Sequence, residues 1–196
     1  EGETSSEVMK TSDIKIPGRH NVENYLAAVT AAWGAVSPEQ MRRVAREFGG
    51  VPHRAELVRV KDGVSYYNDS IGTSPTRTAT GTLSLYDRKI ILIAGGYDKK
   101  IPFDALGPVI VDKVKTLILM GATADQIEAA VKAAPAYAPG KPEILRADSM
   151  EQAVSLARER AKEGDIVSLS PACASFDRYP NFEARGNHFK ELVQAL

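Results

Sequence analysis

The feature that most limits the fold of this chain is the segment KIILIA at residues 89–94, in which Lys89 is followed by an unbroken apolar run. A strand with one face in solvent alternates apolar and polar residues, so a run without alternation predicts a strand that is covered on both faces. Similar runs lie at 116–120 and 166–170, with a weaker one at 143–146. Helical stretches are expected between them, near 103–113, 124–134 and 150–162. This alternation predicts an open, mainly parallel, Rossmann-like α/β sheet with helices on both faces.

An antiparallel hairpin is expected just before this sheet. The pair Asp62-Gly63 separates two short segments with strand character, at 57–60 and 64–67. Asp-Gly between two such segments is among the strongest signals for a two-residue hairpin turn. The hairpin therefore adds one antiparallel strand to the parallel sheet.

Three helices carry local start signals. Ser37, Thr123 and Ser149 each precede a helical pattern and have Gln three residues later. This arrangement predicts a capping box, in which the first side chain accepts a hydrogen bond from the backbone and the Gln side chain returns one. The last helix is expected at about 186–196.

The first fifty residues are expected to form a separate helical part. A short strand is predicted at 14–16, with a turn at Pro17, and a helix is predicted from Asn21. A second helix follows Ser37 and ends before the glycines of the stretch 49–52, where the composition changes. The predicted domains are therefore 1–50 and 51–196.

Composition excludes several classes of protein. The 25 Lys and Arg residues equal the 25 Asp and Glu residues in number, which argues against a nucleic-acid partner, because such partners require excess positive charge. No apolar run is long enough to span a membrane, and residues 1–15 lack the apolar core of a secretory leader. Cys173 is the sole cysteine, so no internal disulfide can form and a cytoplasmic setting is expected.

The chemistry is expected in three loops that follow predicted strands, at 67–75, 94–100 and 168–177. Because ligands in open α/β sheets bind beyond the carboxyl ends of the strands, these loops predict one shared cleft. Each loop also has a plainer interpretation: Asn68 to Ser70 as a turn and helix cap, Gly95-Gly96 as a tight turn, and the following lysines as solvated side chains. Cys173 is interpreted as a small buried hydrophobe, since no activating base lies near it in the sequence.

Several common motifs are missing from the chain. It contains no Gly-x-x-x-x-Gly-Lys-Ser/Thr phosphate loop, no Gly-x-Gly-x-x-Gly fingerprint and no Gly-x-Ser-x-Gly elbow. The histidines His20, His53 and His188 have no zinc-binding spacing, so no metal site is predicted. The residues alone therefore indicate an α/β domain that accommodates a nucleotide or another anion.

Five motifs, in order, resemble the Mur ligase family. They are GRHNVEN at 18–24, PHRAE at 52–56, NDS at 68–70, GGYDK at 95–99 and SPACASFDRYPNFEARG at 170–186. The SPACAS stretch narrows the resemblance to the members that add D-glutamate to UDP-N-acetylmuramoyl-L-alanine. The resemblance implies that 1–50 is the end of a central ATP-binding domain and that 51–196 is the domain that brings in the amino acid.

The resemblance also implies an activity for the complete enzyme in peptidoglycan synthesis. ATP phosphorylates the substrate carboxylate, the amine of D-glutamate attacks the acyl phosphate, and the products are an amide, ADP and phosphate. The phosphate loop, the Mg²⁺ ligands and the UDP-sugar site are implied to lie outside this chain, which alone is expected to be inactive.

The resemblance implies roles for individual residues. Arg54 is implied to reach the γ-phosphate, His53 to flank the nucleotide, and Asp69 to accept from a ribose hydroxyl. The residues implied to bind the nucleotide are Asn21, Asn24, His53, Arg54 and Asp69. Those implied to hold D-glutamate are Thr73, Lys99, Ser175, Phe176 and Phe182, and the catalytic set is Arg54, Lys99 and His53.

One position departs from the family pattern. Many relatives have Lys where this chain has Ile71, so either Lys100 or Arg77 compensates for the lost cation, or the affinity for D-glutamate is weaker. A non-catalytic binding module of the same fold and a part of a folylpolyglutamate synthase relative are the alternative functions.

Overall fold

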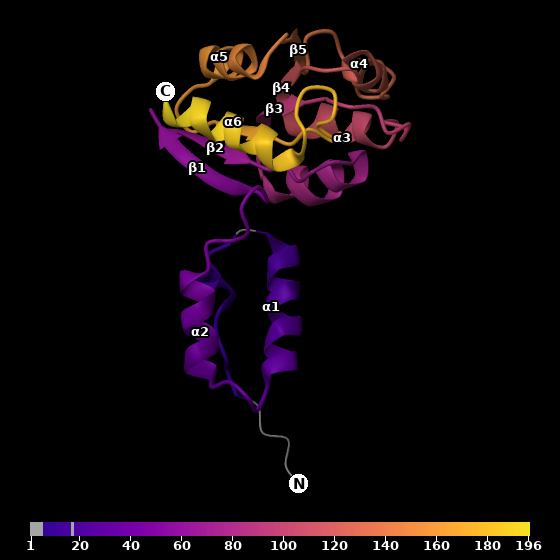
Figure 1. Ribbon diagram of the computed structural model, residues 1–196. Helices are drawn as coiled ribbons and strands as arrows, with labels where there is room; N and C mark the ends of the chain where they lie inside the picture. The colour runs from indigo at the N-terminus through magenta and orange to yellow at the C-terminus, as the bar shows by residue number, and fades with distance from the viewer. Residues whose placement is uncertain (1–5, 17) are drawn as a thin grey trace. The chain divides into compact units, whose positions relative to one another are not determined.

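A computed structural model describes residues 6–16 and 18–196 of the chain (Figure 1). The chain divides into two compact units, Glu1–Gly50 and Val51–Leu196. The units are described separately below.

The first unit is a pair of helices, α1 (Arg19–Ala32) and α2 (Pro38–Glu47), preceded by a 3₁₀ turn, η1 (Thr11–Asp13). The capping box before α2 is confirmed: Gln40 N–H donates to Ser37 Oγ over 3.3 Å, and Ser37 N–H donates to Gln40 Oε1 over 3.0 Å. Proline at the first position of α2 suits this start, because that backbone nitrogen needs no helical partner.

The strand predicted at 14–16 is wrong. Residues 14–16 pair with no strand, and the Lys15 N–H donates instead to the carbonyl of Ala45 in α2 over 3.0 Å. The one backbone donor of Lys15 is used by α2 and is therefore not available to a strand ladder. The turn predicted at Pro17 lies outside the described residues.

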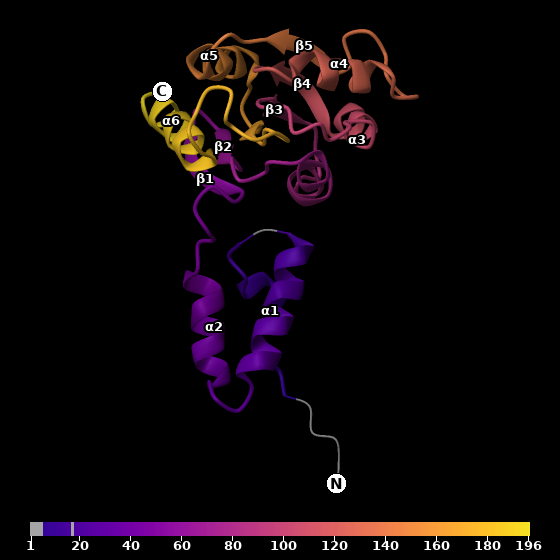
Figure 2. The same ribbon diagram turned by 45° about the vertical axis from the view of Figure 1, so that its right-hand side comes forward.

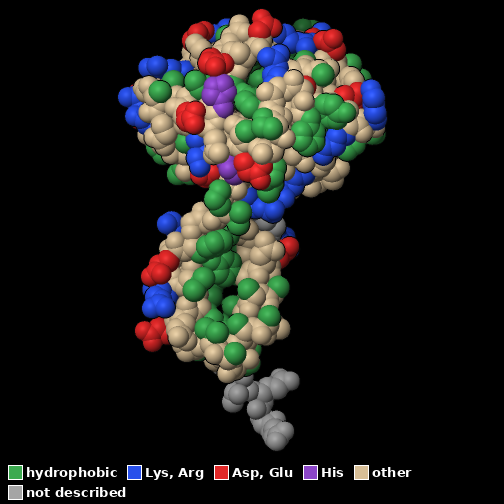
Figure 3. All heavy atoms as spheres, viewed as in Figure 1, with side chains coloured by type: hydrophobic (Ala, Val, Ile, Leu, Met, Phe, Trp, Pro, Cys, Tyr) green, Lys and Arg blue, Asp and Glu red, His purple; other side chains and the backbone are tan. Residues whose placement is uncertain are grey.

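Much of the apolar surface of the first unit is uncovered. Hydrophobic side chains gather on one face of this unit (Figure 3). Among its described residues only Met41 and Ala45 are buried hydrophobics. The large exposed ones are Leu26, Trp33, Val36, Val44 and Phe48. Two helices of this length cannot enclose a core by themselves.

The second unit is built on a six-stranded sheet with the order β1-β2-β6-β3-β4-β5. β1 and β2 are antiparallel, and every other neighbouring pair is parallel, which confirms the predicted fold class. The strands are β1 (Glu56–Lys61), β2 (Val64–Asn68), β3 (Ile90–Ala94), β4 (Val114–Leu119), β5 (Glu143–Arg146) and β6 (Ile166–Leu169). Asp62 and Gly63 form the hairpin turn with φ of 51° and 74°, as a two-residue turn of the mirror-image type requires.

Helices cover both faces of this sheet (Figure 2). The face packed by α3 (Leu106–Lys113) and α4 (Ala124–Lys132) also receives a π-helix, η2 (Arg77–Thr82), and a 3₁₀ turn, η3 (Leu83–Leu85). The opposite face is packed by α5 (Met150–Arg160) and α6 (Phe182–Gln194).

β3 shows why its sequence is apolar throughout. Ile90, Leu92 and Ala94 enter the core cluster beneath α3 and α4, whereas Ile91 and Ile93 enter the cluster beneath α5 and α6. All five side chains are 0–1% exposed. The continuous run is therefore explained by burial on both faces, as predicted.

Three predicted helix starts differ in detail. Thr123 does not cap α4, because its hydroxyl is engaged with the backbone of Gly96: it accepts from Gly96 N and donates to Gly96 O, each over 3.1 Å. The last helix begins at Phe182 rather than 186, because Asn181 Oδ1 accepts from Ala184 N–H over 2.7 Å and caps it there. The predicted cap at Ser149 is confirmed by its bond from Gln152 N–H, although the Gln152 side chain accepts from Asp148 rather than from Ser149.

The chain path places a crevice beyond the carboxyl ends of the central strands. β6 lies between β2 and β3. The connections that follow β2 and β3 pass to the face of η2 and α3, whereas the connection after β6 leads to α6 on the other face. Loops that diverge in this way leave a crevice beyond the carboxyl ends of the strands.

The packing of β3 yields the first prediction. Leu92 is 0% exposed at the centre of the sheet, whereas Leu57 on the edge strand β1 is 51% exposed. We expect Leu92→Ala to lower the free energy of unfolding by about 2–5 kcal/mol, through lost burial and the cavity left behind. Urea denaturation of the chain measures this, with Leu57→Ala as the matched control at no more than about 1 kcal/mol. Equal losses in the two variants would contradict the burial of Leu92 in the core beneath α3 and α4.

Candidate functional site

The three candidate loops meet at one edge of the sheet. They follow β2, β3 and β6, which are parallel neighbours, so their carboxyl ends lie side by side. The loops also bond to one another: Gly95 N–H donates to Pro171 O over 2.8 Å, and Tyr97 N–H donates to Ala174 O over 2.9 Å. The local reason is glycine, because Gly95 and Gly96 have φ of 109° and 151° and a Cβ on Gly95 would stand 2.0 Å from the carbonyl oxygen of Met120.

Two residues predicted to hold the amino acid are in contact. The ammonium of Lys99 donates to Thr73 Oγ1 over 3.3 Å, which joins the loop after β3 to the loop after β2. Lys100 is engaged elsewhere, in an ion pair with Asp98 at 2.8 Å. Of the two lysines, Lys99 is therefore the one that lies beside Thr73.

Asp98 holds this arrangement in place. Its carboxylate accepts from the backbone N–H of Lys100 over 2.7 Å and from Gln126 Nε2, on α4, over 3.1 Å. The hydrogen bond from the Lys100 side chain, followed by those from Gln126 and the Lys100 backbone, lowers the pKa of Asp98 to about 2. The loop is thus anchored to α4 by a carboxylate that stays ionised at neutral pH.

Ser175 and Phe176 lie on the loop after β6. Ser175 is 2% exposed and follows Ala174, the residue that pairs with Tyr97. Phe176 is 65% exposed and meets the Tyr97 ring edge-on, with 5.9 Å between the ring centroids. The strand-like pairing of Ala174 with Tyr97 brings this loop alongside the one that carries Lys99.

His53 is held against the end of β2. It is 8% exposed, its Nδ1 lies 2.9 Å from Asn68 Nδ2, and its ring meets Phe182 edge-on at 5.9 Å. Its carbonyl accepts from Ile71 N–H over 3.2 Å. His53 has φ of 63°, a left-handed conformation that only surrounding contacts can maintain in a residue with a Cβ.

The hydrogen bonds of Asn68 determine the tautomer of His53. Ser70 N–H donates to Asn68 Oδ1 over 3.1 Å, so the amide nitrogen of Asn68 faces the other way. That nitrogen donates to His53 Nδ1 and to Glu56 Oε2. With Nδ1 as the acceptor, the ring proton lies on Nε2, which offers a donor at the other nitrogen. Lys190 completes the set with an ion pair to Glu56 at 2.8 Å.

Asp69 is buried at the centre of a polar cluster. Its side chain accepts from Ala55 N–H over 3.1 Å, from Ser170 Oγ over 3.0 Å and from Thr82 Oγ1. Burial raises the pKa of Asp69, although these hydrogen bonds oppose the shift. The ribose contact expected of Asp69 stays a prediction; in this structure the carboxylate organises the loop, with Arg77 Nη2 at 3.9 Å.

The remaining predicted residues lie as follows. Arg54 is exposed beside the buried His53. Asn21 and Asn24 lie on α1 in the first unit, where Asn24 Nδ2 donates to Asn21 Oδ1 over 3.3 Å. The nucleotide contacts expected of these three residues stay predictions.

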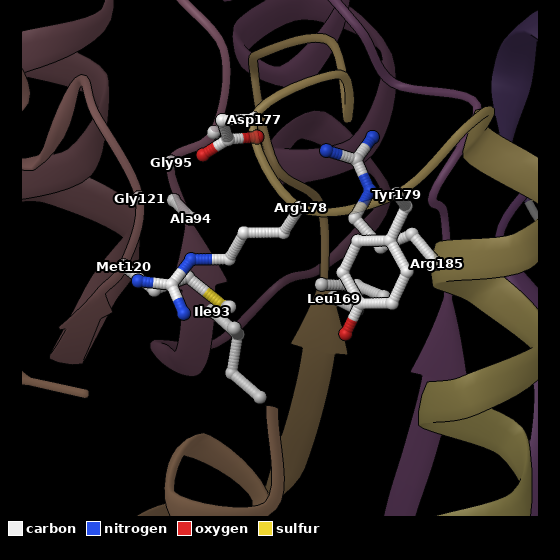
Figure 4. A pocket seen from close by; sticks show the side chains of 11 residues that line it. Ile93, Ala94, Gly95, Met120, Gly121, Leu169, Asp177, Arg178, Tyr179 and Arg185 are labelled. Carbon is white, nitrogen blue, oxygen red and sulfur yellow. The ribbon is translucent and has the colours of Figure 1, made fainter. Parts of the chain in front are cut away.

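A small pocket opens at the carboxyl ends of β3, β4 and β6 (Figure 4). Apolar side chains and glycine backbone line it together with Asp177, Arg178, Tyr179 and Arg185. Sequence reasoning assigned no role to these four residues. The signal for Arg185 was its place in the motif at 181–186, where an arginine follows a helix cap.

Metal binding and membrane insertion were also considered. Within residues 6–16 and 18–196, no group of three His, Cys, Asp or Glu side chains is arranged to hold a metal ion. No helix in the described part of the chain is both long and apolar enough to cross a bilayer.

Fold and site together define a class of protein. It is an α/β domain in which the loops beyond β2, β3 and β6 place a lysine and hydroxyl-bearing side chains at one edge of the sheet. A family model described as "Mur ligase, glutamate ligase domain" matches residues 53–173. The chain belongs to the Mur ligase family.

Relatives and solved structures agree with this assignment. The chain is 54% identical to a UDP-N-acetylmuramoylalanine–D-glutamate ligase of Acetivibrio thermocellus, over 100% of this chain and 42% of the relative. It is 55% identical to one of Clostridium beijerinckii, over 97% of this chain and 41% of the relative. A Mycobacterium tuberculosis folylpolyglutamate synthase complexed with ADP and AMPPCP has the same fold, with a TM-score of 0.61 at 14% identity, over 89% of this chain and 41% of the other. The chain thus spans about two fifths of the length of the curated relatives it matches.

The lowered pKa of Asp98 predicts a pH dependence. A carboxylate whose folded pKa lies below its unfolded value stabilises the fold at pH values above the unfolded pKa. That contribution disappears as the pH falls from about 4 through about 2. Urea midpoints measured from pH 7 to pH 2 should show Asp98→Asn less stable than wild type at neutral pH, with the difference vanishing near pH 2. A difference that is constant with pH would contradict the ion pair.

The contact of α6 with His53 yields a further prediction. Gly186 lies inside α6, where Ala normally stabilises a helix by about 1 kcal/mol relative to Gly. Here a Cβ would lie 2.2 Å from His53 Nδ1 and 3.1 Å from Asn68 Nδ2. We therefore expect Gly186→Ala to lower stability, by about 1–3 kcal/mol. Thermal denaturation measures this, with Asn187→Ala, at the exposed next position, as the neutral control. A stabilised Gly186→Ala would refute the close packing.

Proposed function

We propose that this chain is the amino-acid-binding part of an ATP-dependent ligase that joins D-glutamate to UDP-N-acetylmuramoyl-L-alanine in peptidoglycan synthesis. The names of relatives more than half identical to it support this assignment. In this proposal the phosphate loop, the Mg²⁺ ligands and the UDP-sugar site lie outside the chain, which alone is inactive. The complete enzyme acts in the cytoplasm.

The observation that carries the proposal is the contact of Lys99 with Thr73 across two loops. D-glutamate carries two carboxylates and one amine. An exposed ammonium beside a half-buried hydroxyl provides charge-assisted hydrogen bonds for a carboxylate. The proposal assigns a second hydroxyl to Ser175, which is 2% exposed and follows Ala174 on the neighbouring loop. Phe182 beside the site, and Phe176 on its exposed side, supply apolar surface for the substrate's methylene groups.

The reaction assigns this chain a positioning task. ATP transfers its γ-phosphoryl group to the carboxylate of the muramoyl-alanine, giving an acyl phosphate and ADP. The uncharged amine of D-glutamate attacks the acyl carbon, the C–O bond to phosphate breaks, and the amine loses a proton. Holding both carboxylates of D-glutamate directs its amine at the acyl carbon and lowers the entropic cost of the encounter.

The nucleotide side of the proposal depends on other residues. Arg54 is exposed and free to turn toward a γ-phosphate, for which the fork of a guanidinium is suited. His53 offers a donor at Nε2 from a ring held by Asn68. Asn21 and Asn24 supply amides for the adenine base. The Mycobacterium tuberculosis folylpolyglutamate synthase of the same fold is itself complexed with ADP and AMPPCP.

The alternative functions have weaker support. Likeness to a folylpolyglutamate synthase at 14% identity shows the fold alone.

Ile71 stands where many relatives have Lys, and its side chain is half-buried in the loop that also carries Asp69 and Thr73. The guanidinium of Arg77 approaches Asp69 in the same loop. Of the two cations expected to compensate, Arg77 is therefore better placed than Lys100, whose ammonium pairs with Asp98.

Lys99→Met in the complete ligase tests the proposal. We expect kcat/KM for D-glutamate to fall about a hundredfold or more, because a charged hydrogen bond to the substrate is lost. Phosphate release at varied D-glutamate measures this. Lys100→Met is the matched control, and its activity should stay within about threefold of wild type, since exposed ion pairs contribute little. Unchanged activity of Lys99→Met would favour the non-catalytic module instead.

A further inference from the structure

Arg185, near the start of α6, is a buried cation bonded to two different loops. It is 3% exposed. Its Nε donates to Ser70 Oγ and its Nη2 to Ser70 O, each over 2.9 Å. Its Nη1 donates to Ala174 O and its Nη2 to Cys173 O, each over 3.1 Å. A planar fork with several N–H groups is needed to reach all four acceptors.

The acceptors of Arg185 are all neutral oxygens. Within residues 6–16 and 18–196, no carboxylate forms an ion pair with this guanidinium. Burying a charge without a counter-ion is costly, and hydrogen bonds to carbonyl groups offset only part of that cost. Burial lowers the pKa of Arg185 to about 10, so the side chain still carries its charge at neutral pH. A leucine or methionine would fill the same space but would remove the donor from all four oxygens, so the guanidinium serves to join these loop groups rather than only to pack.

The two loops that Arg185 joins are those that carry candidate substrate groups. Ser70 lies three residues before Thr73, and Ala174 immediately precedes Ser175. Ser70 Oγ also donates to the carbonyl of Phe182 at the start of α6, over 2.8 Å. The loop after β2, the loop after β6 and the start of α6 are therefore tied together at one guanidinium.

We propose that Arg185 is a positioning residue that fixes the separation between the Thr73 loop and the Ser175 loop, and thereby determines the affinity for the amino-acid substrate without contacting it. This inference rests on the proposed function. The guanidinium bonds to the loop backbones at Ser70, Cys173 and Ala174, whereas the proposed function assigns the substrate to Thr73, Lys99 and Ser175. Removing the guanidinium would let the Ser175 loop move away from the Thr73 loop, while the bonds of His53 to Asn68 and Ile71 lie within the Thr73 side of the site and remain.

The test uses the complete ligase with Arg185→Lys, which keeps the charge but loses the fork. We expect KM for D-glutamate to rise about tenfold to a hundredfold, as for a displacement of catalytic groups by about 1 Å. KM for ATP should stay within about twofold of wild type. Arg59→Lys is the matched control, because Arg59 likewise donates to α6 carbonyls, those of Val193 and Gln194, at the far end of the helix. Its KM for D-glutamate should not change.

A purely structural role predicts a different pattern. In that case Arg185→Lys would lower the thermal midpoint and reduce kcat in proportion to the folded fraction, with both KM values unchanged, and this result would overturn the proposal. A second variant, Ser70→Ala, removes only the Nε acceptor and the bond to Phe182. Ser70→Ala should raise KM for D-glutamate about threefold or more, even if Arg185→Lys does not fold. An unchanged KM for D-glutamate in Ser70→Ala would also overturn the proposal.

The outcome also separates this inference from the proposed function. If the wild-type ligase releases no phosphate in response to D-glutamate, the proposed function fails and this inference fails with it. If the wild type responds and Arg185→Lys has an unchanged KM for D-glutamate, the inference alone is wrong.

Discussion

The insertion of β6 between β2 and β3 is the constraint on which the rest of the structure depends. Parallel pairing on both sides of β6 places three loops at one edge of the sheet, and the connections leave toward opposite faces. Everything proposed for the site follows from this placement, because Thr73, Lys99 and Ser175 are far apart in the chain. The burial of β3 on both faces stabilises the arrangement, since it anchors the centre of the sheet in two cores.

The site stands on a polar layer that is itself buried. Asn68, Asp69 and Ser70 are each 0% exposed. Their side chains form hydrogen bonds with neighbouring protein groups rather than with solvent. Asn68 orients His53, Asp69 binds Ser170 and Thr82, and Ser70 binds Arg185. A fully bonded layer of this kind is rigid, because each lost bond would leave a polar group unsatisfied in a region of low dielectric constant. The exposed residues above it, such as Lys99 and Phe176, can then be held in place by short loops.

Much of the architecture could be predicted from local patterns. The apolar run of β3 and the turn at Asp62-Gly63 depend on neighbouring residues, and both were predicted correctly. The loop contacts of single side chains were less accessible. Thr123 has the sequence of a helix cap, yet its hydroxyl bonds to Gly96 in another loop. The start of α6 was placed too late because Asn181 follows an irregular loop that has no periodicity of its own.

The sequence by itself determined the α/β class, the strands of the sheet and most of the helices, and the family whose motifs the chain carries. These follow from side-chain periodicity, turn residues and spacing, all of which act over short distances along the chain. Only the tertiary structure decided that Lys99 meets Thr73, that Asn68 sets the tautomer of His53, and that a buried guanidinium ties two loops together. Those contacts join residues distant in sequence, and their geometry depends on which strands pair, which no local pattern contains.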